Sequence, residues 1–260
     1  PIRDLQGVAE LPREYETSVL RGAGFEVAED ERLYSINENI LGVTMSGSEI
    51  DTFDAPNDVL ARRLTAPRKE WPTEPMDVTF SFKSGELVAV DGAAASGPEM
   101  LKHLNQRFGA YGVGRGIYTG DTVIGLKGRI VFEAPGLFSM LEAHRAIEEI
   151  TLAKSQAASK PPIAAQWTDL VYSGLFHDPL RTDIEAFIRS TQQRVTGDVV
   201  VRTDGATCLA VSVDAPHALV GEGAIYAQHA DWTAGEAEGF IRMYGQSTAL
   251  WTDAAEPAST

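Results

Sequence analysis

The order in which the hydrophobic pattern changes its period constrains the fold of this chain most. Apolar and polar residues alternate through 78–90 around a turn at 83–86, which predicts a β-hairpin. A second hairpin is predicted over 198–213, around a turn at 203–206. Helical patterns lie between the two hairpins. This order lacks the strict alternation of strand and helix that builds a parallel nucleotide-binding sheet, so we expect an α+β fold of antiparallel hairpins packed by helices.

Local signals mark where the helices begin and end. Ser96 and Glu99 have the spacing of a capping box, which predicts a helix that runs to Gly109. Asp178 followed by Pro179 predicts the start of another helix. Between them we expect a longer helix that buries one apolar stripe, formed by Leu137, Met140, Leu141, Ile147 and Ile150.

Three stretches are expected to be irregular. Residues 51–75 lack periodicity and are rich in proline, so we expect an extended excursion there. Residues 112–135 have a strand-like pattern that we expect to be interrupted at 119–121. Residues 157–162 end in two prolines and are expected to form a loop.

Composition excludes several classes of partner. The formal net charge of −15 and the isoelectric point near 4.7 argue against nucleic acid and against an anionic membrane as partners. The single cysteine, Cys208, excludes an internal disulfide and a cysteine metal cage. No apolar run approaches the roughly 20 residues that span a bilayer, and the first residues lack the apolar core of a signal peptide. We therefore expect a cytoplasmic protein.

Few residues have the spacing of a catalytic motif. No phosphate-binding loop and no H-E-x-x-H pair is present, so we predict no metal site. His144 is expected to be a core histidine and Cys208 a small buried hydrophobe. Arg115, Lys127 and Arg129 lie near glycines in an otherwise acidic chain. They either approach an anionic ligand or are solvated surface charges, and composition alone does not decide between the two.

Several motifs in consistent order resemble one known family, the argininosuccinate synthases. The matching stretches span almost the whole chain and are Tyr-Ser-Ile-Asn-Glu-Asn at 34–39, Gly-Val-Gly-Arg at 112–115, the segment 125–136, the segment 170–180, the segment 193–199 and Gly-Phe-Ile at 239–241. The resemblance implies the catalytic and multimerisation domain of that family over 34–252. Residues 1–33 then resemble the end of its nucleotide-binding domain, and 253–260 are expected to form a flexible tail.

The resemblance also implies a reaction and its partners. Members of the family join citrulline to aspartate at the expense of ATP, which leaves as AMP and pyrophosphate. ATP with Mg²⁺ is then expected to bind mainly to a nucleotide-binding half outside this chain, such as a separate ATP-pyrophosphatase-type subunit. The small amino-acid-like substrate binds to this domain, which is also expected to form homo-oligomers, as the family's tetramers do.

The resemblance places the substrate contacts at Ser35, Thr44, Gly120 and Phe132. Ser35 and Thr44 keep the hydroxyls of the family's serines. Gly120 replaces a glutamate and Phe132 a tyrosine, and the loss of a carboxylate that pairs with a buried substrate ammonium costs about 2–5 kcal/mol. The basic residues named above, Arg115, Lys127 and Arg129, are expected to hold the pocket wall and neutralise anions.

Three functions remain open at this stage. The first is a ligase that joins an aspartate-like amine to an adenylated ureido or carbonyl substrate related to citrulline. The second is a piece of an ordinary argininosuccinate synthase that acts on citrulline itself. The third is a non-catalytic relative that serves as an oligomerisation or regulatory partner.

Overall fold

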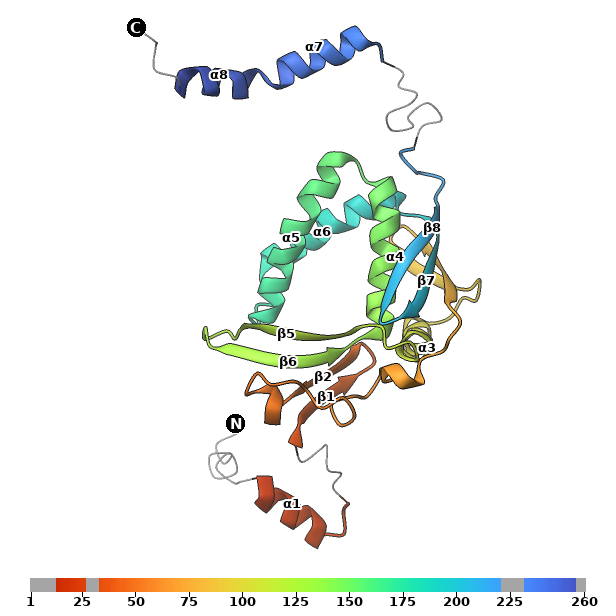
Figure 1. Cartoon of the computed structure of the whole chain (residues 1–260), viewed down its shortest axis with the longest axis vertical. Coiled ribbons are helices and arrows are strands. Elements are labelled where there is room, and N and C mark those ends of the chain that lie inside the picture. The colour runs from red at the N-terminus through yellow and green to blue at the C-terminus, as the bar shows by residue number, and fades with distance from the viewer. Residues whose placement is uncertain (1–12, 27–32, 221–231, 256–260) are drawn as a thin grey trace. The chain divides into compact units, whose positions relative to one another are not determined.

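The computed structural model describes residues 13–26, 33–220 and 232–255 (Figure 1). The chain divides into two units, and the boundary along the sequence lies between Ala218 and Leu219. The larger unit contains two antiparallel four-stranded sheets with helices between and beside them. The expected α+β class is therefore confirmed.

The first sheet is built from two hairpins that come from distant parts of the chain. Its strand order is β1-β2-β6-β5, with all neighbours antiparallel. The strands are β1 (Ser35–Asn39), β2 (Gly42–Ser46), β5 (Arg115–Asp121) and β6 (Lys127–Glu133). The β1–β2 hairpin has no counterpart in the sequence prediction. The turn of the other hairpin lies after Asp121, so the interruption expected at 119–121 is wrong, and those residues pair within the sheet.

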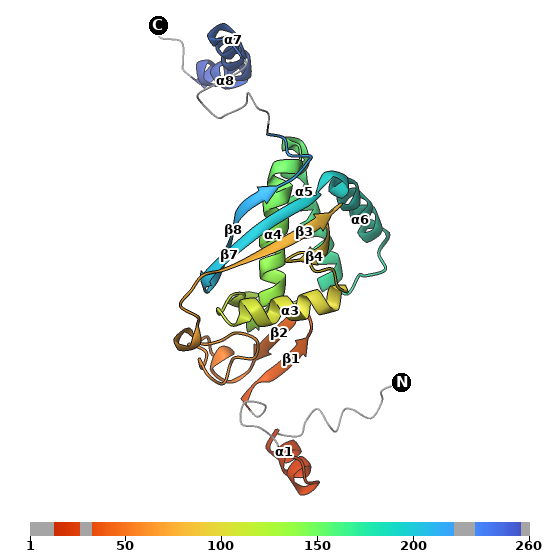
Figure 2. The ribbon, with the colours of Figure 1, turned by 90° about the vertical axis from the view of Figure 1, so that its right-hand side faces the viewer.

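The second sheet carries the main hydrophobic core. Its strand order is β4-β3-β7-β8, with β3 (Met76–Lys83), β4 (Glu86–Val90), β7 (Gly197–Gly205) and β8 (Thr207–Asp214). Both predicted hairpins are confirmed and pair with each other through β3 and β7. Figure 2 shows this sheet in front of α4 (Pro135–Thr151), with α3 (Gly97–Gly109) crossing near one end of α4. Phe80, Phe108 and Ile147 are buried at the centre of this core.

Helix α4 buries only part of the expected stripe, since Ile147 is buried and Met140 packs against the core but Leu141 does not. Ala143, Ala146 and Ile147 are buried, whereas Leu141 is 60% exposed. The small residues face the second sheet, because α4 packs closely against β7 and β8. The hydrophobic pattern alone therefore predicted the wrong burial for Leu141 and did not identify Ala143 and Ala146 as buried.

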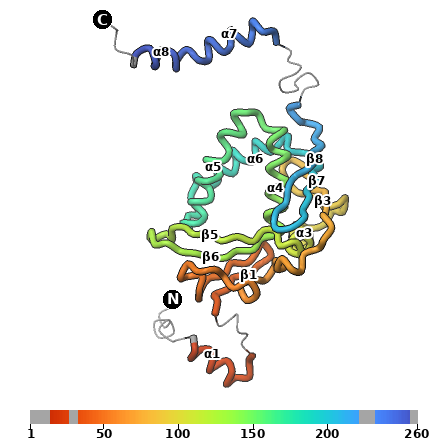
Figure 3. Tube along the Cα trace, in the orientation of Figure 1, coloured from red at the N-terminus to blue at the C-terminus, as the bar shows by residue number. Residues whose placement is uncertain are grey.

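Helices α5 (Lys154–Tyr172) and α6 (Pro179–Thr191) pack against each other. They connect α4 to β7, and Figure 3 shows this path of the chain. The loop expected at 157–162 is wrong, because α5 continues through Pro161 and Pro162. The carbonyls that lose their helical donors belong to the exposed Ala157 and Ala158, so water can bind them. The predicted start at Asp178 is confirmed, since its carboxylate accepts a hydrogen bond from the Leu180 amide.

The remaining helices lie near the two ends of the described chain. Helix α1 (Arg13–Gly22) is amphipathic and ends close to Gly24. The second unit contains α7 (Ala234–Tyr244) and α8 (Gln246–Ala255). The expected domain 34–252 thus extends across both units. The tail expected from 253 begins inside α8, and residues 256–260 lie outside the described part.

A buried carboxylate holds the irregular excursion 51–75 against the first sheet. Glu133 in β6 is completely buried and accepts hydrogen bonds from the amides of Arg63 (2.8 Å) and Leu64 (2.6 Å). The amide and hydroxyl of Thr65 also donate to it, and Arg115 Nη1 lies 3.3 Å from Glu133 Oε1. These donors compensate the cost of burying the charge, and they order a segment that has only 3₁₀ turns of its own.

Replacing this carboxylate with an amide tests the anchor. Glu133→Gln leaves the Arg115 charge unpaired and places an NH₂ group among donors, so we expect a loss of about 3–5 kcal/mol in the free energy of unfolding, measured with urea. Glu149→Gln is the matched control, because Glu149 is exposed and pairs with Arg145 on the surface of α4. The control should change stability by no more than about 0.5 kcal/mol. Equal effects of both substitutions would show that Glu133 is not the anchor.

Candidate functional site

The register of the first sheet places the four implied substrate positions on one face. Thr44 pairs directly with Phe132, and Phe132 pairs directly with Gly116. Side chains alternate between faces along a strand, and directly opposite residues share a face. Ser35 and Gly120 follow with the same parity. We call this surface the open face, and its residues are Ser35, Asn37, Asn39, Gly42, Thr44, Ser46, Gly116, Tyr118, Gly120, Gly128, Ile130 and Phe132.

The same register places the three basic residues on the opposite face. Arg115 donates to the carbonyl of Ala61 at 2.8 Å and to Glu133. The Lys127 ammonium pairs with the carboxylate of Asp121 at 2.7 Å. These contacts hold the excursion and the strand ends, and they do not converge on Ser35 or Thr44.

Arg129, the third basic residue, is also occupied on that opposite face. It donates to the carbonyl of Asp54 at 2.7 Å and lies 5.7 Å from the centroid of the Phe53 ring. The structure thus does not bring the three basic residues together with the other implied positions. Their expected role in neutralising an anionic ligand on the open face has no geometrical support among the described residues.

The sequence analysis missed polar residues of the open face, among them the two that pair directly with Thr44 and Ser35. Asn37 pairs directly with Thr44, and Ser46 pairs directly with Ser35. The four side chains form a block of hydroxyl and amide groups across β1 and β2. The alternation of side chains along 35–39 could have identified Asn37, but identifying Ser46 also requires the turn at 39–42 to be recognised. In that turn the Leu41 amide donates to Asn39 Oδ1 at 2.8 Å.

Aromatic rings cover the glycines at the other side of the open face. A Cβ at Gly116 would lie 2.6 Å from Phe132 Cζ, so the Phe132 ring rests on this glycine. Phe132 stacks on Phe138 of α4, with 5.8 Å between the ring centroids. A Cβ at Gly120 would lie 2.2 Å from the Tyr118 hydroxyl. Both glycines therefore leave room for a ring to lie flat on the strand.

The start of β1 is fixed by a hydrogen bond beside Ser35. The buried Tyr34 donates its hydroxyl to Glu49 Oε1 at 2.6 Å. Partial burial on its own raises the pKa of Glu49, but the hydrogen bonds from Tyr34 and from the Asn57 amide outweigh it and lower the pKa to about 2. Burial and the nearby Glu49 carboxylate raise the pKa of Tyr34 to about 12. The pair positions the first residue of the open face.

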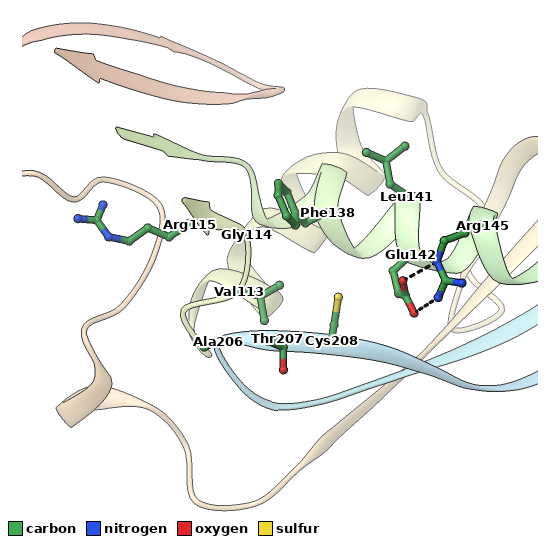
Figure 4. Close-up of a pocket in the computed structure, with 10 residues that line it drawn as sticks. All are labelled: Val113, Gly114, Arg115, Phe138, Leu141, Glu142, Arg145, Ala206, Thr207 and Cys208. Atoms are coloured by element: carbon green, nitrogen blue, oxygen red, sulfur yellow. Dashed lines mark hydrogen bonds and ion pairs between the residues drawn. The ribbon is translucent and has the colours of Figure 1, made fainter. Parts of the chain in front are cut away.

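A pocket of about 490 Å³ lies beside the stacked rings, between β5, α4 and the start of β8 (Figure 4). Figure 4 shows Glu142 bound to Arg145, with the Cys208 side chain nearby and Arg115 pointing away from them. Burial, together with the Glu142 charge, raises the pKa of the Cys208 thiol to about 11, so the thiol stays protonated and is a poor nucleophile. Cys208 packs partly buried against the core, close to the expected role.

His144, which lies outside the open face, has a structural role. His144 lies 3.0 Å from Gln192 through its Nε2 and packs edge-on against Phe82, which confirms a core histidine. Burial lowers its pKa, so it is neutral at pH 7. No group of three or more histidine, cysteine, aspartate or glutamate side chains in the described part is arranged to hold a metal ion. Among the described helices, none has the length and apolar character needed to cross a membrane.

Comparison with known proteins agrees with the motifs. The family profile for the arginosuccinate synthase C-terminal domain matches residues 34–251. The argininosuccinate synthases of Xanthomonas campestris pv. campestris and Xylella fastidiosa are 54% and 53% identical over 251 residues, which is 96% of this chain and 63% and 62% of theirs. The argininosuccinate synthase of Methanocaldococcus jannaschii is 33% identical over 96% of this chain. This chain therefore spans a little over three fifths of the length of these relatives.

The Tyr34–Glu49 pair predicts a specific acid dependence of stability. The pKa of Glu49 falls from 4.5 to about 2 on folding, so its contribution is complete above about pH 4.5 and is lost as the pH falls toward 2. Tyr34→Phe should lower the free energy of unfolding by about 1 kcal/mol at pH 7, and the difference should shrink below pH 4. Urea unfolding at each pH measures it. A difference that stays constant from pH 7 to pH 2 would contradict this assignment.

Proposed function

Because this chain belongs to the argininosuccinate synthase family, through the C-terminal domain of that family, we propose that its open face binds the ureido substrate of an ATP-dependent carbon–nitrogen ligase. The ligase joins an aspartate-like amine to the activated ureido carbon. Since the chain spans a little over three fifths of its relatives' length, the activity of the whole enzyme is part of the proposal.

One observation carries the proposal: the register of four strands brings the implied substrate positions onto a single face. Ser35 and Thr44 come from the first hairpin, and Gly120 and Phe132 from the second. They converge only because β2 pairs with β6. The face is also accessible, since Thr44, Gly120 and Phe132 are partly exposed and Ser35 is exposed.

The hydroxyl and amide groups on β1 and β2 suit a ligand rich in hydrogen-bonding groups. Ser35 and Thr44 can donate to a carboxylate or accept from an amino group of the substrate. Asn37, between them, offers both a donor and an acceptor. These residues hold and orient the substrate, and the stacked rings of Phe132 and Phe138 provide an apolar surface beside it. Orientation of this kind accelerates the reaction between two bound molecules, because their translational and rotational freedom is already lost when they bind.

We place the binding of ATP with Mg²⁺ mainly outside this chain, because the described residues offer no glycine-rich turn between a strand and a helix. The nearest glycine-rich segment, 112–116, follows a helix, and its Arg115 is bound to Glu133 and to the Ala61 carbonyl. No described cluster of acidic residues or histidines suits a metal ion. We propose that a nucleotide-binding domain of the ATP-pyrophosphatase type supplies the activated substrate to the open face. Assembly into a homo-oligomer remains a further part of the proposal.

Substitutions on the two faces of the same sheet test the assignment. Ser35→Ala and Thr44→Val each remove one hydroxyl, and we expect each to raise the KM for the ureido substrate about tenfold. Lys127→Ala is the control, because Lys127 lies on the opposite face and is exposed. The assay measures pyrophosphate release from ATP with citrulline and aspartate, with a nucleotide-binding domain of the family supplied.

The control should retain the KM of the unmodified chain. No ureido-dependent pyrophosphate release under any condition would leave the non-catalytic function in its place. Unchanged kinetics after both hydroxyl substitutions would remove the open face as the binding site.

A further inference from the structure

We propose that the Tyr118 hydroxyl is a specificity-determining group of the open face, and that it selects a substrate whose nearby group is an uncharged hydrogen-bonding group. This inference rests on the proposed function and names the chemistry that the site accepts at that end. It assigns a role to a residue outside the family motifs quoted above.

The first argument is the position of the Tyr118 phenol. Tyr118 and Gly120 lie two residues apart on β5 and share the open face. A Cβ at Gly120 would lie 2.2 Å from the Tyr118 hydroxyl and 2.4 Å from Tyr118 Cζ. The phenol thus fills the space that a side chain at position 120 would take. Any group of the substrate directed toward position 120 meets the hydroxyl of Tyr118 instead.

The second argument is reach. With strands about 4.8 Å apart and residues about 3.3 Å apart along a strand, the Cα of Tyr118 lies about 12 Å from that of Thr44, and the Cα of Gly120 about 16 Å. Thr44 is on β2 and Tyr118 on β5, with β6 between them. A small amino-acid-like ligand that contacts Thr44 is therefore closer to Tyr118 than to Gly120. The Tyr118 ring runs from its own backbone toward Gly120 and is 56% exposed, so its hydroxyl is accessible to a ligand that spans the open face.

The third argument is charge. Within β1, β2, β5 and β6, which the structure describes completely, every charged side chain lies on the face opposite to the open face. These residues are Glu38, Arg115, Asp121, Lys127, Arg129 and Glu133. The strands therefore offer no carboxylate to an ammonium group bound on the open face. An ammonium that loses water there without a counter-charge is strongly disfavoured.

A phenol hydroxyl, in contrast, suits a neutral partner. It donates one hydrogen bond and accepts others, so it pairs equally with a hydroxyl or an amide. Forming such a hydrogen bond does not require a charged group to be removed from water. The open face is thus complementary to a ligand that is polar but uncharged beside Tyr118.

A pair of isosteric ligands tests the inference on this chain directly. L-Citrulline carries an α-ammonium, and 2-hydroxy-5-ureidopentanoate carries a hydroxyl at the same carbon. Titration calorimetry measures both dissociation constants. We expect the hydroxy compound to bind at least as tightly as citrulline. Tyr118→Phe, which removes only the hydroxyl, should weaken binding of the hydroxy compound about fivefold.

Two further variants separate specificity from a structural effect. Tyr172→Phe is the matched control, because Tyr172 is exposed and its hydroxyl lies 3.4 Å from the carbonyl of Asp121 at the end of the same strand. It should leave both affinities unchanged. The double variant Tyr118→Ala with Gly120→Glu replaces the phenol by a carboxylate, and it should reverse the preference in favour of citrulline by tenfold or more.

Each outcome decides one proposal. If citrulline binds to the unmodified chain more than threefold tighter than the hydroxy compound, the inference about Tyr118 is overturned while the proposed function stands. An effect of Tyr118→Phe no larger than that of Tyr172→Phe overturns it as well. If neither ligand binds to the unmodified chain, and Ser35→Ala changes nothing in the ligase assay, the proposed function itself fails.

Discussion

The hydrogen bonds to Glu133 hold the first sheet and the irregular excursion together. A single buried carboxylate accepts from three consecutive backbone amides, 63–65, and pairs with Arg115. The excursion has no regular strand or long helix within its described residues 51–75, so its own hydrogen bonds do not fix its position. With Glu133 in place, the excursion covers one face of the sheet, and the other face is left accessible. The candidate site exists because this coverage is one-sided.

The two-residue period of a β-strand then places the charged side chains of β5 and β6 on one face of the sheet. Charged residues of β5 and β6 lie on the face that the excursion covers. Arg115 and Arg129 donate to carbonyls of the excursion. Lys127 pairs with Asp121 across the two strands. Hydroxyl, amide and aromatic residues alternate with them and point to the open face. The basic residues that resemble an anion site along the sequence are thereby separated from the substrate positions implied by the family resemblance, because adjacent residues on a strand lie on opposite faces.

The open face combines a polar half with an aromatic half. The polar half lies on β1 and β2, and its first residue is fixed by the bond between Tyr34 and Glu49. The aromatic half lies on β5 and β6, where glycines let Phe132 and Tyr118 lie flat on the strand. Pairing between β2 and β6 joins the halves, so a ligand bound across them contacts both hairpins. Membership of the argininosuccinate synthase family gives this surface its proposed ligand, and the residues present are the basis of its proposed selectivity.

The sequence by itself determined the features that depend on neighbours along the chain. These are the hairpins at 78–90 and 198–213, the capping box at Ser96, the helix start at Asp178, and the family, which rests on short ordered motifs. Tertiary structure decided the rest. The small-residue stripe of α4 and the pairing that places Thr44 and Phe132 on the face opposite to Arg129 each depend on residues distant in sequence. Local propensity is set by adjacent residues, whereas the facing partner of a strand or helix is set by packing, which no local pattern contains.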